Sequence, residues 1–154
     1  MLSVRIGLLL GREKLATASP CATVFDASRL MLDNAASAVV VVEGDLLTGI
    51  LTEHDVVFRV VATGRDPGAV RIDEVMTRAP ITAGPEAALG HALALMHLHG
   101  CRHLPVVEAG RPIGIILARS ALDPELEDFI CEARRREAFS RSATAAGSSA
   151  AAST

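Results

Sequence analysis

Aromatic side chains are scarce in this chain of 154 residues, which has no Trp, no Tyr and only four Phe. Proteins that bind single-stranded nucleic acid usually stack the bases on aromatic rings. The formal net charge is −3, whereas a groove for a phosphate backbone needs a clear excess of Lys and Arg. Both shortages argue against a nucleic-acid partner.

Cysteines and long apolar runs are also few. The cysteines are Cys21, Cys101 and Cys131. They form no CxxC pair, and a small, odd number of cysteines is typical of reduced thiols in the cytosol. The apolar run at residues 6–10 is short for a signal peptide, and no stretch reaches the ~18 apolar residues of a membrane span. We therefore expect a cytoplasmic protein that does not enter the membrane.

Patterns of common active sites are missing as well. The sequence has no GxGxxG, no P-loop and no pair of nucleophile and base. His91, His97 and His99 are not spaced four residues apart, so they do not share a helix face as a pair of metal ligands would. We therefore expect neither an enzyme nor a metal site.

An internal repeat organises the sequence. Pro20 recurs as Pro85 and Gly49 as Gly114, both at an offset of 65 residues and without a gap. A dozen or so identities at one offset are hard to obtain by chance, and a fixed period is examined before any other feature of the fold. Half of the residues are apolar, which suffices for one domain or for two very small ones that share a core.

Hydrophobic periodicity predicts the same elements in each copy. The first copy has a helix over residues 23–34, strands over 38–42 and 46–51, and a helix over 53–63. In the second copy, residues 70–80 form a connector, followed by a helix over 86–99, strands over 104–108 and 113–117, and a helix that starts at Asp123-Pro124. We assign residues 1–68 to the first repeat with an N-terminal lead-in segment, 69–139 to the second, and 140–154 to a disordered tail.

One copy alone cannot bury both faces of its small sheet. We therefore predict an α/β (α+β) fold, in which two βαββα repeats pack with pseudo-twofold symmetry and leave clefts between them.

Thr52 and Asp55 stand at the start of the helix over residues 53–63, and their spacing allows two interpretations. Thr-x-x-Asp before an apolar run resembles a capping box, with Asp in place of the usual Glu or Gln. A carboxylate beside the free N–H groups of a helix start also suits a sugar diol or the neighbourhood of a phosphate. These residues alone do not decide between the two.

Three motifs in order give the repeat its family resemblance. They are Gly-Ile-Leu-Thr-Glu-His-Asp at 49–55, Val-Met-Thr-Arg-Ala-Pro-Ile-Thr at 75–82, and Arg-His-Leu-Pro-Val-Val at 102–107. Over roughly residues 5 to 125 the chain resembles a tandem pair of cystathionine-β-synthase (CBS) domains, a Bateman module. The resemblance implies a non-catalytic regulatory module that forms homodimers, acts on an unidentified protein partner and needs no obligatory cofactor. Its ligand would be AMP, ADP or ATP, with S-adenosylmethionine less favoured, bound between the repeats.

The resemblance also implies roles for single residues. Asp55 would accept hydrogen bonds from the ribose hydroxyls, and Thr52 would bond near the 5′ oxygen or phosphate. Arg102 and His103 would face the phosphates, although His103 also suits a packed core position. The adenine side would be lined by Met76, Thr77, Ile81 and Thr82. Arg59 is assigned to solvent, with a phosphate as its alternative.

The second copy departs from this pattern. Leu117 and Ser120 stand where Thr52 and Asp55 stand, and Ser37 and Ala38 stand where Arg102 and His103 stand. We therefore expect one nucleotide site per chain. The alternative is a ligand-free dimerisation or interaction module whose nucleotide sites have decayed.

Overall fold

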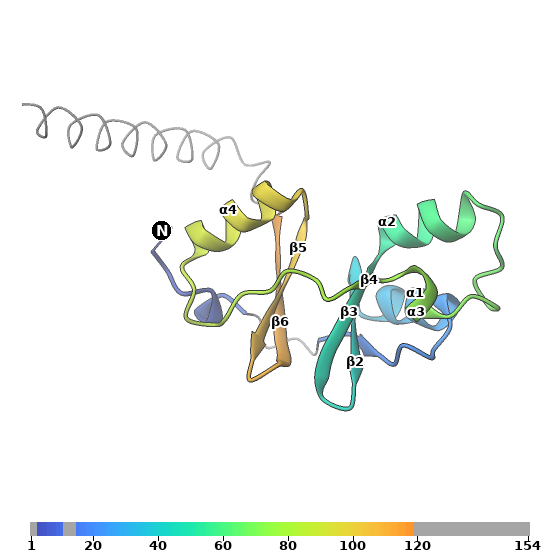
Figure 1. The fold of residues 1–154 in the computed structure, drawn as a ribbon, viewed down its shortest axis with the longest axis horizontal. Helices are drawn as coiled ribbons and strands as arrows, with labels where there is room; N and C mark the ends of the chain where they lie inside the picture. Colours follow the sequence, from blue (N-terminus) through green and yellow to red (C-terminus); the bar gives the residue numbers. More distant parts are fainter. Residues whose placement is uncertain (1–2, 11–14, 119–154) are drawn as a thin grey trace, which may run out of the picture. The chain divides into compact units, whose positions relative to one another are not determined.

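A computed structural model describes residues 3–10 and 15–118 of the chain (Figure 1). The chain divides into two compact units, residues 1–117 and 118–154, and every element named below belongs to the first. The predicted helix at Asp123 and the predicted disordered tail therefore lie outside the described residues.

The first repeat is built on a small sheet flanked by helices. Its elements are β1 (Thr17–Ala18), α1 (Val24–Asp33), β2 (Ala38–Glu43), β3 (Leu46–Thr52) and α2 (Glu53–Val56), which continues as the π-helix η2 (Val57–Val61). β1 pairs with β2 in parallel, and β2 with β3 in antiparallel. The predicted helix and strand pair are therefore present, whereas the second half of the predicted helix over 53–63 has the wider π geometry.

The second repeat follows the same plan. The remaining elements are η1 (Ile6–Leu8), α3 (Ile72–Val75), β4 (Thr77–Arg78), α4 (Leu89–His99), β5 (His103–Glu108) and β6 (Arg111–Leu117). The connector predicted over 70–80 thus contains a helical turn and a short strand, and β4 pairs with β3 of the first repeat. α4 begins three residues later than predicted, because Ala88 has extended backbone and forms a bridge with Arg5.

The strand register confirms the repeat. The β2–β3 hairpin has an irregularity between Val41 and Val42, and the β5–β6 hairpin has one between Val106 and Val107, 65 residues later. The parallel pair Ala18–Val41 recurs as Ala83–Val106. The described residues therefore form the expected mixed α+β fold of two related units.

The two lead-in segments, residues 4–10 and 70–76, each bond to the opposite repeat. The Ile6 amide donates to the Ala87 carbonyl, and the Ile72 amide donates to the Ala22 carbonyl, both over 2.9 Å. These pairs correspond at an offset of 65 in the body of the repeat but 66 in the lead-in segments. A sequence alignment at one constant offset cannot show this one-residue difference.

Two glycines let the lead-in segments lie directly on the hairpins. A Cβ on Gly49 would meet the Met76 Sδ at 2.5 Å, and a Cβ on Gly114 would meet a Leu10 Cδ at the same distance. The close approach explains why the sequence has Gly at both of these equivalent positions. It also fixes Met76 against β3, near the start of α2.

The largest core cluster lies in the first repeat. Val39, Val41, Leu51, Val60 and Ile72 are fully buried in it. Leu51 precedes Thr52 directly, and Val60 lies in η2, so both ends of the α2–η2 helix are anchored by buried side chains. None of the described helices has the length and apolar character needed to cross a bilayer.

Candidate functional site

The candidate site starts at the end of β3, where Thr52 caps α2. Its backbone is extended, at φ −108° and ψ 162°, and its hydroxyl accepts a hydrogen bond from the Asp55 amide at 3.3 Å. Asp55 Oδ2 accepts from the Thr52 amide at 2.9 Å and from the Thr52 hydroxyl at 2.8 Å. The predicted capping box is thus confirmed, with Asp in place of Glu or Gln.

α1 carries a second capping box of the same composition, Thr23 with Asp26. There the carboxylate accepts from the Thr23 hydroxyl at 2.8 Å and from the Thr23 amide at 3.1 Å, and these bonds lower the pKa of Asp26. Asp26 is exposed, whereas Asp55 is only 5% exposed. Capping alone does not require burial of the carboxylate, so the surroundings of Asp55 need a further explanation.

Arg59 supplies part of those surroundings. Its Nε lies 3.3 Å from Asp55 Oδ1, and its Nη1 donates to the Val75 carbonyl over 2.8 Å. One guanidinium therefore links the carboxylate to the second lead-in segment, directly before Met76. The sequence analysis assigned Arg59 to solvent. The four-residue spacing from Asp55 is the signal for the ion pair, whereas no sequence pattern indicates the bond to Val75.

The four residues predicted for the adenine side fall into two pairs. Met76 is buried against Gly49, and Thr77 is exposed on β4, where it pairs with Ile50 of β3. Ile81 and Thr82 are half-buried. They precede Ala83, whose amide donates to the Pro105 carbonyl of β5. The segment therefore leads from β3 of the first repeat to β5 of the second.

His103 links the two repeats near the start of α2. Its Nε2 lies 2.7 Å from the Ser37 hydroxyl, and the Ser37 carbonyl accepts from the Glu53 amide at 3.0 Å. His103 is thus connected through one residue to the first turn of α2. Ser37 was expected beside the second site, and the structure instead pairs it with His103.

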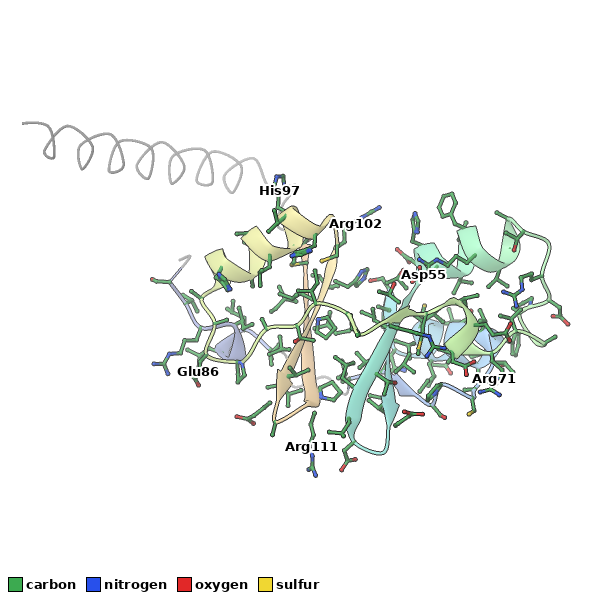
Figure 2. The ribbon with its side chains drawn as sticks, in the orientation of Figure 1. Asp55, Arg71, Glu86, His97, Arg102 and Arg111 are labelled. Carbon is green, nitrogen blue, oxygen red and sulfur yellow. The ribbon has the colours of Figure 1, made fainter. Side chains whose placement is uncertain are left out.

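Arg102 precedes β5 and is exposed (Figure 2). Within residues 3–10 and 15–118, its side chain has no hydrogen bond or ion pair. The guanidinium is therefore available to an anionic ligand. At the second site, Leu117 pairs with His103 and Ala38 with Thr52, while Ser120 lies outside the described part of the chain.

The structure also contains a hollow of about 450 Å³ that the sequence analysis did not predict. It lies between α1 and α2, and none of the predicted ligand residues lines it. Its apolar lining is Met31, Leu32, Ala35, Ala36, Val56 and Val57. Such an exposed apolar surface is typical of a contact with another protein.

Comparison with known proteins identifies relatives of this arrangement. A family model for the CBS domain matches residues 11–62 and 72–124. The chain is 37% identical over 103 residues to the CBS domain-containing protein YhcV of Bacillus subtilis, a match that covers 67% of this chain and 73% of the relative. An uncharacterized conserved protein from Pyrococcus horikoshii has a similar structure, with a TM-score of 0.72, 28% identity, and coverage of 81% of this chain and 94% of that one.

A further similar structure contains a ligand. The CBS domain protein PAE2072 from Pyrobaculum aerophilum, solved in complex with AMP, has a TM-score of 0.70 and covers 75% of this chain and 88% of its own. At 22% identity this likeness shows the fold alone.

Proposed function

Because this chain belongs to the CBS domain family and carries two such domains in tandem, we propose that it is a regulatory module that binds an adenine nucleotide, AMP, ADP or ATP, at one site between them. Tandem CBS pairs are regulatory modules and are generally not catalytic. The complex of one structural relative with AMP supports this class of ligand. The free thiols of Cys21 and Cys101 suit the reducing cytoplasm, where we propose the protein acts.

The burial of Asp55 carries this proposal. The exposed Asp26 shows that the same capping box forms without burial, so the cap does not account for the position of Asp55. A buried carboxylate needs partners of opposite charge or good donors. Its Oδ1 contacts only the half-exposed Arg59 among the described residues, which leaves this oxygen able to accept from a ribose hydroxyl.

The other proposed contacts follow from the chemistry of a nucleotide. Arg102 would bind phosphate through its guanidinium, with His103 held beside it by Ser37. Met76, Thr77, Ile81 and Thr82 would contact the base, since a pocket for a flat ring is mainly apolar with a few polar groups. Thr52 would bond near the 5′ oxygen.

Calorimetric titration with AMP, ADP, ATP and S-adenosylmethionine tests the proposal. We expect one of the adenine nucleotides to bind with a stoichiometry of one per chain. Ser120→Ala should leave its Kd unchanged, because Ser120 stands at the second site. A stoichiometry of two equal sites, or no binding of any of the four compounds, would refute the proposed function.

A second role, homodimerisation, has its own support. The α1–α2 face has an apolar hollow, and large apolar side chains are exposed beside it, namely Phe25, Leu32, Val57 and Phe58. A second copy of the chain that covers this face would remove these side chains from water. We propose that dimerisation occurs here whether or not a nucleotide is bound.

A further inference from the structure

We infer that Arg59 is a positioning residue for the nucleotide site, which holds the second lead-in segment in place against the Asp55 carboxylate. This inference rests on the proposed nucleotide function, because it assigns Arg59 a part in that same site. The guanidinium would act on the ligand through Asp55 and through Met76–Thr77.

The contacts of Arg59 have the geometry of a bridge. Nε lies 3.3 Å from Asp55 Oδ1, on the same helix, and Nη1 donates over 2.8 Å to the Val75 carbonyl, 16 residues further along the chain. A planar guanidinium can direct donors to two groups at once, whereas the ammonium of Lys is a compact point charge. The side chain is still 51% exposed, so its arrangement does not come from burial alone.

Both partners need a donor. Asp55 Oδ2 is used by Thr52, which leaves Oδ1 for Arg59. Val75 is the last residue of the single-turn helix α3, and Met76 after it is extended, at φ −65° and ψ 159°. Carbonyl groups at a helix end have no donor within the helix. Arg59 supplies that donor to Val75 and neutralises Asp55 in the same position.

The segment that Arg59 holds has little regular structure of its own. β4 contributes only two residue pairs to the sheet, Gly49–Arg78 and Ile50–Thr77, and α3 has four residues. Met76 and Thr77 lie between these two short elements. Each side-chain contact that fixes the segment therefore has a large share in the position of the proposed base-side residues.

The second repeat supports the inference because it lacks both members of the bridge. At the offset of 65 residues, Asp55 corresponds to Ser120, and Arg59 corresponds to Pro124, which has no side-chain donor. The glycines that pack the lead-in segments are present in both repeats. The bridge thus occurs only where the proposed nucleotide site has its carboxylate.

Arg59→Met, Arg59→Lys and a control, Arg29→Met, test this role by calorimetry with AMP and with adenosine, well below the melting temperature. Arg29 is suited as the control because it also pairs with an Asp four residues away, at 3.9 Å, but it stays on its own exposed helix. We expect Arg59→Met to raise the Kd about 10-fold for both ligands, since a bond to a charged partner is lost. Arg59→Lys should be nearly as weak, and Arg29→Met should match the wild type.

Hydrogen exchange of peptides covering residues 72–80, without ligand, measures the bridge itself. We expect faster exchange in Arg59→Met and Arg59→Lys than in Arg29→Met. If Arg59→Met speeds exchange but leaves both Kd values unchanged, Arg59 is only structural and the inference is wrong, while the proposed function stands. A loss confined to AMP and restored by Lys would make Arg59 a phosphate contact and would also overturn the inference. No binding by the wild type would overturn the proposed function, and the inference with it.

Discussion

Replacement of Asp55 by alanine, next to the same replacement of Asp26, separates ligand binding from helix capping. Both residues accept from the amide and the hydroxyl of a Thr three positions earlier, at nearly the same distances. They differ in exposure, because Asp55 is buried and Asp26 is not. The pair therefore provides a matched control within one chain.

The two variants should differ little in stability without ligand. Loss of a cap at Asp55 costs about 0.5–2 kcal/mol, and about 1 kcal/mol lowers the Tm by roughly 2–4 °C in a chain of this size. Asp26→Ala also loses a cap, so its Tm should fall in the same direction. A dye-based thermal melt suits the measurement, because the chain has no Trp or Tyr to report unfolding.

Ligand affinity should separate the variants. Loss of hydrogen bonds to a charged group costs ~1.5–3 kcal/mol, so Asp55→Ala should raise the nucleotide Kd about 10- to 100-fold. Saturating nucleotide, at about 100 times its Kd, should stabilise the wild type and Asp26→Ala by ~2.7 kcal/mol but stabilise Asp55→Ala much less. If both variants keep the wild-type affinity, Asp55 is only a cap and the reasoning from burial is refuted.

Three further outcomes follow from the structure. Gly49→Ala and Gly114→Ala should each destabilise the fold by about 1–3 kcal/mol in thermal melts, because the new methyl group would collide with Met76 or Leu10, whereas Gly84→Ala, which has open space, should not. The Thr23 hydroxyl and amide lower the pKa of Asp26 below 3.8, so its stabilising effect is complete above that pH and is lost as the pH falls through the folded-state pKa; Asp26→Asn should therefore lose less Tm than the wild type between pH 5 and 3, and an equal loss would contradict the assignment. Phe58→Lys should yield monomers in light scattering while Leu8→Lys, also exposed, leaves the dimer intact; two dimeric variants would exclude the α1–α2 face.

Elements with a strong local pattern were predictable. The strand pair β2–β3 consists of apolar runs on either side of a tight turn, and the capping box depends on a three-residue spacing, so both are visible in the sequence. α3 and β4 have only four and two residues, which is too few for any periodicity to show. The late start of α4 depends on the bridge between Arg5 and Ala88, two residues far apart in the chain.

The candidate site was predictable to the same extent. Thr52, Asp55 and His103 lie in recognisable motifs, and the structure connects them through Ser37 and Glu53. The contact between Arg59 and Val75 depends on how the lead-in segment crosses the opposite repeat, and this crossing is absent from any local pattern. The difference in burial between Asp26 and Asp55 has the same origin, since their local sequences are alike.

The comparison of the two repeats argues for a ligand rather than for a fold requirement. The features that they share are the hairpin register, its irregularity and the glycine that accepts a lead-in segment, and all of these serve packing. The differences around the helix after the hairpin concern polar side chains, Thr52, Asp55 and Arg59 in the first repeat against Leu117, Ser120 and Pro124 in the second. Since the second hairpin forms without these polar groups, the first does not need them in order to fold. Their concentration at the start of α2, beside the link from His103 to Ser37, is therefore best explained by a polar ligand at that position.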